Sequence, residues 1–376
     1  TIAPMSQIAP PAKGLPILGA LSVPSRAAIL ATLAVSATAI VLDLGLHVEG
    51  TAVFVVAAGA ILGLAWVVGL ATERLGAVTG PQVGGVLNAT FGNIAELIIA
   101  FFALQAGLID VVKGSLTGSI IGNLLLVLGV SVFAGGVRHG TQRFSQRVAG
   151  SNAALLVVAA IGLFIPAVFA ASGGDREPGT LVEESVLVAI LLIAGYAASL
   201  VFQFTNPDRT LGAHEAVSGH GGPAWSGRTA VGVLLGAAAL LALLSEILVG
   251  SIEPFVESFG LSEFFVGVIL IPTIGNLAEH LVAVQLAWKD RMEFAMAVCY
   301  GSSLQVALFV APVLVLVGVL VGQPMDLVFA PLEVAAVGAA VGISALIALA
   351  GESNWLEGAL LAIVYVILAV SFFELV

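Results

Sequence analysis

Two glutamates stand in apolar surroundings at the same place in a motif that occurs twice. The stretches TFGNIAEL and TIGNLAEH each place an asparagine three positions before a glutamate: Asn93 before Glu96, and Asn276 before Glu279. Residues three apart lie on one face of a helix, so each motif presents an amide oxygen and a carboxylate on one stripe. Hard divalent cations such as Ca2+ prefer these oxygen ligands. The two motifs therefore predict a cation site.

Composition places both motifs in a membrane protein. Of the 376 residues, 60% are hydrophobic and 9% are charged, and the mean hydropathy is +1.15. Apolar runs of about twenty residues recur along the chain, which is the length that a helix needs to cross a bilayer. The expected fold class is an all-α polytopic membrane protein. The single cysteine, Cys299, cannot form a disulfide within the chain or a thiolate metal site by itself.

A glutamate inside a membrane needs a physical reason. An uncompensated carboxylate at mid-membrane costs roughly 2.5 kcal/mol or more, and neither Glu96 nor Glu279 has a Lys or Arg nearby in its own span. Such a group should hold a proton when metal is absent and release it when a divalent cation arrives. The pair therefore predicts proton-coupled cation exchange. His280 is a further candidate for tuning or relaying that proton, although its place next to Glu279 on a helix points it toward a neighbouring helix or cavity wall.

Glycines and a second polar segment extend each motif. Gly92 and Gly275 precede the asparagines, and we expect the helices to break there so that backbone carbonyls can face the ion. The segments GSLTGSIIGNLLLVLG and CYGSSLQVALFV add further polar side chains, namely Ser119, Asn123, Ser302, Ser303 and Gln305. These side chains could complete the coordination shell. The alternative reading is that small and polar residues in spans are helix-packing contacts.

Gly, Pro and charge clusters divide the apolar sequence into eleven predicted spans. These lie near 25–42, 51–71, 81–106, 112–135, 151–171, 184–204, 229–250, 264–288, 293–320, 327–350 and 355–374. Residues 1–24 are expected to form an irregular arm that is not cleaved, because they contain prolines and no compact signal region.

The cationic residues orient these spans. With eleven spans, ten of the twelve lysines and arginines fall on the side of the N-terminus, and Lys113 and Arg176 fall on the other side. Short cationic loops stay cytoplasmic. We therefore predict a cytoplasmic N-terminus, an outside C-terminus and an integral membrane protein, in the cell (inner) membrane if the source is prokaryotic.

The chain contains an internal repeat with an offset of 183 residues. Besides the two motifs, this offset pairs Gly84 with Gly267, Thr90 with Thr273, Gly118 with Gly301, Ser119 with Ser302, and Gly135 with Gly318. A run of polar and glycine coincidences at one offset indicates duplication. The two copies begin on opposite sides of the membrane, so the repeat is inverted, as in secondary transporters with a midplane site. The predicted organisation is a first helix at 25–42, one five-helix repeat at 51–204, a cytoplasmic linker at 205–228 and a second repeat at 229–376.

The paired motifs GNIAELI with GSIIGNLLLVLG, and GNLAEH with GSSLQVALFV, resemble the Ca2+/H+ exchanger (CAX) family of the cation/Ca2+ exchanger superfamily. The resemblance implies eleven helices and Ca2+ export driven by inward proton flow. It also implies that Glu96 and Glu279 are ion ligands and that the site is lined by Asn93, Asn276, Ser302, Ser303 and Gln305. Ca2+ and H+ are then the transported partners, in a lipid bilayer. A homo-oligomer is compatible with this assignment. No organic cofactor, nucleic-acid partner or enzymatic activity is expected.

Three other functions have partly similar sequence patterns. Sodium/calcium exchangers resemble this pattern but have GTSxPE and GTSxPD at these positions, whereas Ala95 and Ala278 replace the proline here. Sodium coupling is therefore the second choice. A cation channel also uses acidic rings, and it would pass Ca2+ without a counter-gradient. The stretch AHEAVSGH lacks the histidine spacing of a zinc protease, because Ser218 stands where the second histidine is needed.

Overall fold

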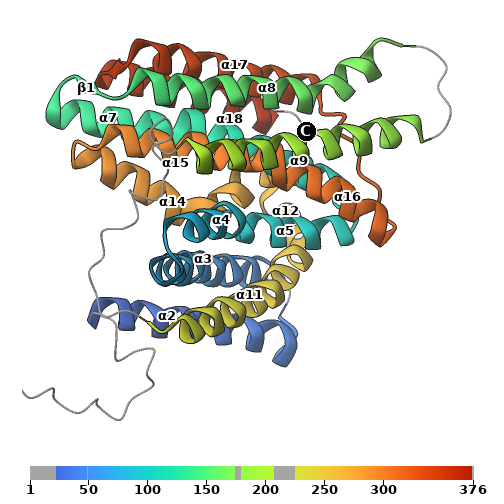
Figure 1. Cartoon of the computed structure of the whole chain (residues 1–376). Helices are drawn as coiled ribbons and strands as arrows, with labels where there is room; N and C mark the ends of the chain where they lie inside the picture. Colours follow the sequence, from blue (N-terminus) through green and yellow to red (C-terminus); the bar gives the residue numbers. More distant parts are fainter. Residues whose placement is uncertain (1–22, 49, 174–178, 207–224, 375–376) are drawn as a thin grey trace, which may run out of the picture.

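The computed structural model describes residues 23–48, 50–173, 179–206 and 225–374. Within these residues the chain is helical apart from turns and one short strand pair. Figure 1 shows the long helices stacked in layers, with most of their axes pointing in roughly the same direction. The predicted all-α membrane fold is confirmed, and ten helical stretches are long and apolar enough to cross a membrane.

The helices of the first half follow the predicted spans closely. In chain order they are α2 (Val23–Ile40) with the π-helical turn η1 (Val41–Gly45), α3 (Thr51–Thr79), α4 (Pro81–Phe91), α5 (Ile94–Gln105), α6 (Ile109–Ile121) with η2 (Gly122–Val127), α7 (Leu128–His139), strand β1 (Gln142–Arg143), α8 (Gln146–Ala171) and α9 (Thr180–Thr205). The linker predicted at 205–228 lies mostly outside the described residues, as does the arm at 1–24.

The second half repeats this order. It comprises α11 (Gly227–Gly250), α12 (Ile252–Phe259), α13 (Glu263–Phe265) with η4 (Val266–Leu270), α14 (Ile271–Trp288), α15 (Met292–Gln305) with η5 (Val306–Val310), α16 (Ala311–Val321), α17 (Pro331–Ala350), strand β2 (Glu352–Ser353) and α18 (Trp355–Glu374). The span predicted at 327–350 begins later, because residues 323–330 are not helical.

The predicted span 81–106 is two helices in the structure. The chain turns at Gly92 and Asn93, between α4 and α5, and this turn explains why α5 is a short apolar helix rather than a full span. Counting α4 and α5 as one crossing gives the eleven crossings that the sequence predicts.

Helix α12 was not predicted. The stretch falls between the predicted spans 229–250 and 264–288, yet Ile252 and Phe255 are buried on one face of a helix. The ring of Phe255 stacks on Phe54 of α3 with centroids 4.0 Å apart. The spacing of Ile252, Phe255 and Phe259 is that of an amphipathic helix, and it was the available signal.

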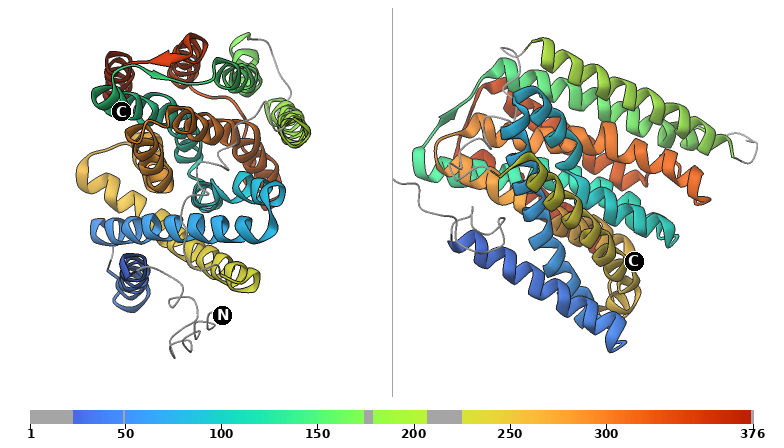
Figure 2. Two further views of the ribbon diagram at one scale, coloured as in Figure 1. Left: turned by 60° about the vertical axis from the view of Figure 1, so that its left-hand side comes forward. Right: turned by 60° about the horizontal axis from the view of Figure 1, so that its bottom comes forward.

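The corresponding first helices of the two repeats, α3 and α11, pack side by side, with α2 against α3. Figure 2 shows α3 and α11 crossing at one edge of the molecule. On the other side, α7 packs on α18 and α14, and α8 packs on α17 and α15. Helix α5 lies between these groups, because it contacts α11, α6 and α14.

A small antiparallel ribbon joins two loops that are far apart in sequence. Gln142 pairs with Ser353, and Arg143 pairs with Glu352. The side chain of Gln142 also donates to the carbonyl oxygen of Ala287 at 3.1 Å. Three loops therefore meet on one face of the molecule, and the alternation of eleven spans also assigns these three loops to one side of the membrane.

We predict that this face is cytoplasmic. A cysteine placed at Thr141, which is exposed in the loop before β1, should resist an impermeant thiol reagent in intact cells and react after the membrane is permeabilised. The control is Ser258→Cys on α12, also exposed, which should react in intact cells. The native Cys299 is buried and gives little background. Rapid labelling at position 141 from outside would overturn the orientation.

Candidate ion-binding site

The two glutamates come from helices that cross near the centre of the fold. Glu96 lies in the first turn of α5, directly after the break at Gly92 and Asn93. The N-terminus of a helix favours negative charge, so the break gives the carboxylate a partial compensation. Glu96 is 7% exposed. Glu279 lies in the middle of α14 and is half-buried, and the two carboxylates are close enough to interact electrostatically.

One oxygen of Glu96 is held by both repeats. The hydroxyl of Ser119 on α6 donates to Glu96 Oε1, and the amide of Asn276 on α14 donates to the same oxygen. All three side chains are buried. The first carboxylate is therefore fixed in orientation by one donor from its own repeat and one from the other.

The asparagine of the first motif belongs to a second network. Asn93 donates from Nδ2 to Gln305 Oε1 at 2.6 Å, and its Oδ1 accepts from the hydroxyl of Ser302 at 3.0 Å. Asn123 donates in turn to Ser302 Oγ at 3.0 Å. Residues from both repeats alternate along this network.

Three oxygens at the site have no hydrogen-bond donor among the described residues. They are Glu96 Oε2, Asn276 Oδ1 and Glu279 Oε2, and each of these three atoms is buried. A buried acceptor without a partner is costly, so such atoms call for a ligand, a proton or water. Two carboxylate oxygens and an amide carbonyl are the types that a hard divalent cation binds. The site therefore offers three oxygens of the kind that Ca2+ binds.

The predicted helix break at Gly275 is wrong. Helix α14 runs without interruption from Ile271 to Trp288, because the irregular backbone of this segment lies earlier, in the π-helical turn η4. Gly275 has a different use, since a Cβ built there would lie 2.8 Å from Glu96 Cγ. The glycine lets the second repeat approach the first glutamate closely.

Two predicted site residues lie apart from these networks. The hydroxyl of Ser303 donates to the carbonyl of Cys299 in its own helix at 2.9 Å, so it does not point into the hydrogen-bonded cluster. His280 is half-buried, and within the described residues no side-chain hydrogen bond joins it to Glu279. The roles predicted for these two residues find no geometric support.

Sequence reasoning missed the π-helical turns that follow both serines. Turn η2 follows Ser119, and turn η5 follows Ser302, at corresponding places in the two repeats. The amide of Leu128 bonds to the carbonyl of Asn123, and that of Ala311 to the carbonyl of Val306, which are matching pairs. Single π-helical turns in longer helices are frequent at functional sites. Residue propensities carry no signal for them.

The repeats differ in how tightly they close over the site. Gly118 of α6 packs so closely on η4 that a Cβ there would collide with the carbonyl oxygen of Val268. Its counterpart Gly301 on α15 has nothing near its Cβ position within 4 Å. Helix α4, which corresponds to the η4 segment, packs instead mainly on α3, where Gly84 meets Gly76. Within the described residues, α15 therefore makes no comparably close contact with α4.

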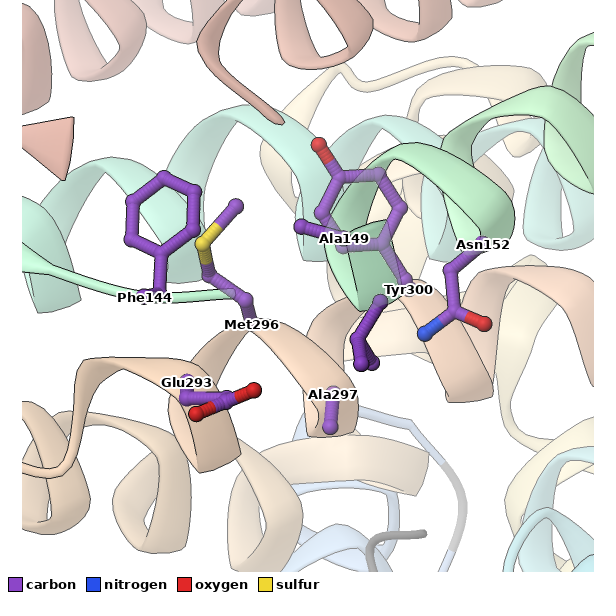
Figure 3. A pocket seen from close by; sticks show the side chains of 8 residues that line it. Phe144, Ala149, Asn152, Glu293, Met296, Ala297 and Tyr300 are labelled. Atoms are coloured by element: carbon purple, nitrogen blue, oxygen red, sulfur yellow. The ribbon is translucent and has the colours of Figure 1, made fainter. Parts of the chain in front are cut away.

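A small pocket lies between α8 and α15, and neither Glu96 nor Glu279 lines it. Figure 3 shows the carboxylate of Glu293 and the amide of Asn152 among the side chains that line it, with Met296 and Tyr300 between them. Tyr300 uses its hydroxyl to donate to the carbonyl of Ser344 at 2.6 Å. With one carboxylate and largely apolar walls, this pocket lacks the ligands that the site at Glu96 offers.

Comparison with known proteins places this geometry in a family. A family model described as sodium/calcium exchanger protein matches residues 49–205 and 229–373, which are nearly the two predicted repeats. The Ca2+/H+ antiporter of Synechocystis sp. is 46% identical over 345 residues, covering 86% of this chain and 91% of that protein. The Ca2+/H+ antiporter ChaA of Bacillus subtilis is 42% identical over 337 residues, covering 88% and 94%.

Solved structures agree. The structure of native YfkE has a TM-score of 0.79 at 38% identity and covers 92% of this chain and 99% of its own. The crystal structure of the H+/Ca2+ exchanger CAX has a TM-score of 0.71 at 14% identity, covering 94% and 93%, and shows the shared fold alone. The chain therefore belongs to the sodium/calcium exchanger protein family, in its branch of Ca2+/H+ antiporters.

Proposed function

We propose that this chain is a Ca2+/H+ antiporter in which Glu96 and Glu279 bind either Ca2+ or protons. The observation that carries the proposal is the set of three buried, unpartnered oxygens contributed by these glutamates and Asn276. Relatives that are 46% and 42% identical along most of the chain are Ca2+/H+ antiporters, which supports the same exchange here.

Charge explains why one pair of carboxylates serves both ions. Within the described residues, no three or more His, Cys, Asp or Glu side chains lie close enough together to hold a metal ion by themselves. The charge at the site is therefore that of the two glutamates. Two ionised carboxylates balance one Ca2+, and two protons neutralise the same pair when Ca2+ has left. In either loaded state the site carries no net charge through the low-dielectric interior, whereas the empty ionised pair is costly.

The remaining residues would shape the site. Ser119 and Asn276 hold Glu96 so that its second oxygen is left for the ion. Asn93, Ser302 and Gln305 would border the site through the hydrogen bonds that join them. Gly275 lets α14 approach α5, and Gly92 stands at the turn that begins α5. The inverted repeats then present this one site to either side in turn.

Flux measurements on sealed vesicles test the function. Uptake of radioactive Ca2+ should follow an imposed pH gradient and collapse when a protonophore removes that gradient. Replacing K+ by Na+ on the side opposite Ca2+ should leave the rate unchanged, since the first motif has Asn93 and Ala95 instead of a hydroxyl-rich shell. Uptake that needs a sodium gradient would favour Na+/Ca2+ exchange, and uptake that needs no gradient would favour a channel.

A further inference from the structure

Two helix ends at one face of the molecule carry cations that no carboxylate neutralises. Arg138 lies in the last turn of α7, and Lys289 directly follows the last residue of α14. Both are exposed, and within the described residues neither takes part in an ion pair. The acid next to Lys289 in sequence is Asp290, whose Oδ1 accepts from Gln142 Nε2 at 2.8 Å. This face therefore presents positive charge that can attract an anion.

Trp288 joins the two helix ends. The guanidinium carbon of Arg138 lies 4.7 Å from the centroid of the Trp288 ring. His139 Nε2 donates to the carbonyl oxygen of Trp288 at 2.9 Å. Figure 1 shows the end of α7 and the turn between α14 and α15 at the same edge of the molecule. A guanidinium held over a ring keeps its N–H donors available, and their planar arrangement suits two oxygens of one phosphate.

An exposed apolar stripe on α7 ends beside these cations. Val130, Phe133 and Val137 are 38%, 42% and 61% exposed, and their spacing places them on one face of the helix. Helix α7 packs on α18 and α14 with its other faces. Trp288 is 47% exposed, and tryptophans of this kind mark the level at which acyl chains meet lipid headgroups. The stripe therefore lies at the depth of the acyl chains, and Arg138 lies at the level of the headgroups.

We propose that the surface formed by Val130, Phe133, Val137, Arg138 and Lys289 binds an anionic phospholipid. An acyl chain lies along the stripe, the lipid phosphate accepts from Arg138, and Lys289 adds the second positive charge. A free phosphate ion would use the cations alone, whereas a phospholipid also covers the apolar stripe. The inference does not depend on which ions are exchanged, because the glutamate site uses none of these five residues.

Fluorescence quenching on the full-length protein in vesicles tests the proposal. A fluorophore on Val137→Cys reports which lipid occupies the surface, and the native Cys299 is buried and gives little background. The vesicles are phosphatidylcholine in which a rising share of lipid is exchanged either for brominated phosphatidylglycerol or for brominated phosphatidylcholine. We expect the apparent affinity for phosphatidylglycerol to be about tenfold higher or more, because each of two surface cations contributes about fivefold.

Charge variants connect this preference to the two cations. Arg138→Gln and Lys289→Gln should each lower it about fivefold, and the double variant should remove it. Arg228→Gln is the matched control, since Arg228 is an exposed cation near the start of α11. It should change the preference less than about twofold, because a charge farther away than the Debye length is screened. Lys289 is exposed, so its variant still gives a result if Arg138→Gln is not monodisperse.

Equal quenching by the two brominated lipids in the unsubstituted background would overturn the proposal. A preference that both glutamine variants leave unchanged would overturn it as well. So would an equal loss in Arg228→Gln, which would indicate general surface charge. Excess inorganic phosphate at constant ionic strength should leave the preference in place. If it removes the preference, the cations bind free phosphate and the assignment to a lipid is wrong.

Discussion

Glu96→Gln and Glu279→Gln should each abolish Ca2+/H+ exchange, lowering the pH-driven flux by about a hundredfold or more. Glutamine keeps the shape of the side chain but can neither balance the charge of Ca2+ nor carry a proton. Losing one buried charged partner costs about 2–5 kcal/mol in comparable pairs, which sets this scale. Flux of radioactive Ca2+ in proteoliposomes, normalised to protein content, measures the loss.

The control removes a charge of the same kind away from the site. Glu352 lies on strand β2, where its side chain is 52% exposed and faces Arg143 at 3.4 Å. Glu352→Gln should leave the flux near the wild-type rate, because an exposed ion pair contributes little. A glutamine variant at position 96 or 279 that exchanges Ca2+ for protons at the wild-type rate would show that the glutamates only pack the interior.

The wild-type protein should also bind Ca2+ more weakly as the pH falls. Protons and Ca2+ compete for the same two carboxylates, so acid populates the protonated pair and excludes the metal. Calorimetric Kd values measured across a pH series give the dependence. An affinity that acid leaves unchanged would contradict competition at these glutamates.

Gly275→Leu should have the second largest effect and reduce transport to near background. The Cβ alone would lie 2.8 Å from Glu96 Cγ, and the rest of a leucine side chain has no room unless α5 and α14 separate. Such a shift would pull Asn276 away from Glu96 and open the donor set. The measurement is Ca2+ flux together with the Kd for Ca2+.

Gly338→Leu on α17 is the matched control. Gly338 is exposed on its helix and has nothing within 4 Å of its Cβ position. The same substitution there should keep expression, elution profile and flux. If Gly275→Leu transports normally as well, the close approach of the helices is not needed for the site.

The motifs predicted which side chains come together in the fold better than how these side chains bond. Spacing and duplication were enough to select Asn93, Glu96, Asn276 and Glu279, because a polar side chain in an apolar span has few physical reasons to be there. The hydrogen bonds could not be predicted in full, since Ser119 and Ser302 have equivalent places in the sequence, yet Ser302 donates to Asn93 of the other repeat besides lying within hydrogen-bonding reach of Glu279. That outcome depends on where Asn123 and Gln305 lie in space.

The backbone was predicted in part. Gly92 marks a true break, followed by the irregular backbone angles of Asn93. Gly275 has the same neighbours in sequence and continues a helix, because η4 already supplies the irregularity of that segment. A glycine permits a break or a close contact equally well. Tertiary packing decides between these two uses, and packing is not visible in a single sequence.

The hydrogen bonds at the site also constrain how such a protein could have arisen. Asn276 bonds to Glu96, Ser302 and Gln305 bond to Asn93, and Asn123 bonds to Ser302, so four of five contacts join residues of different repeats. A single repeat alone would hold one glutamate and only two or three of the five donors. An ancestor of half this length could therefore have bound the ion only as a pair of chains inserted in opposite directions. Fusion of two such genes would fix one copy in each orientation, and it would let Asn123 arise in one repeat while the other has Val306.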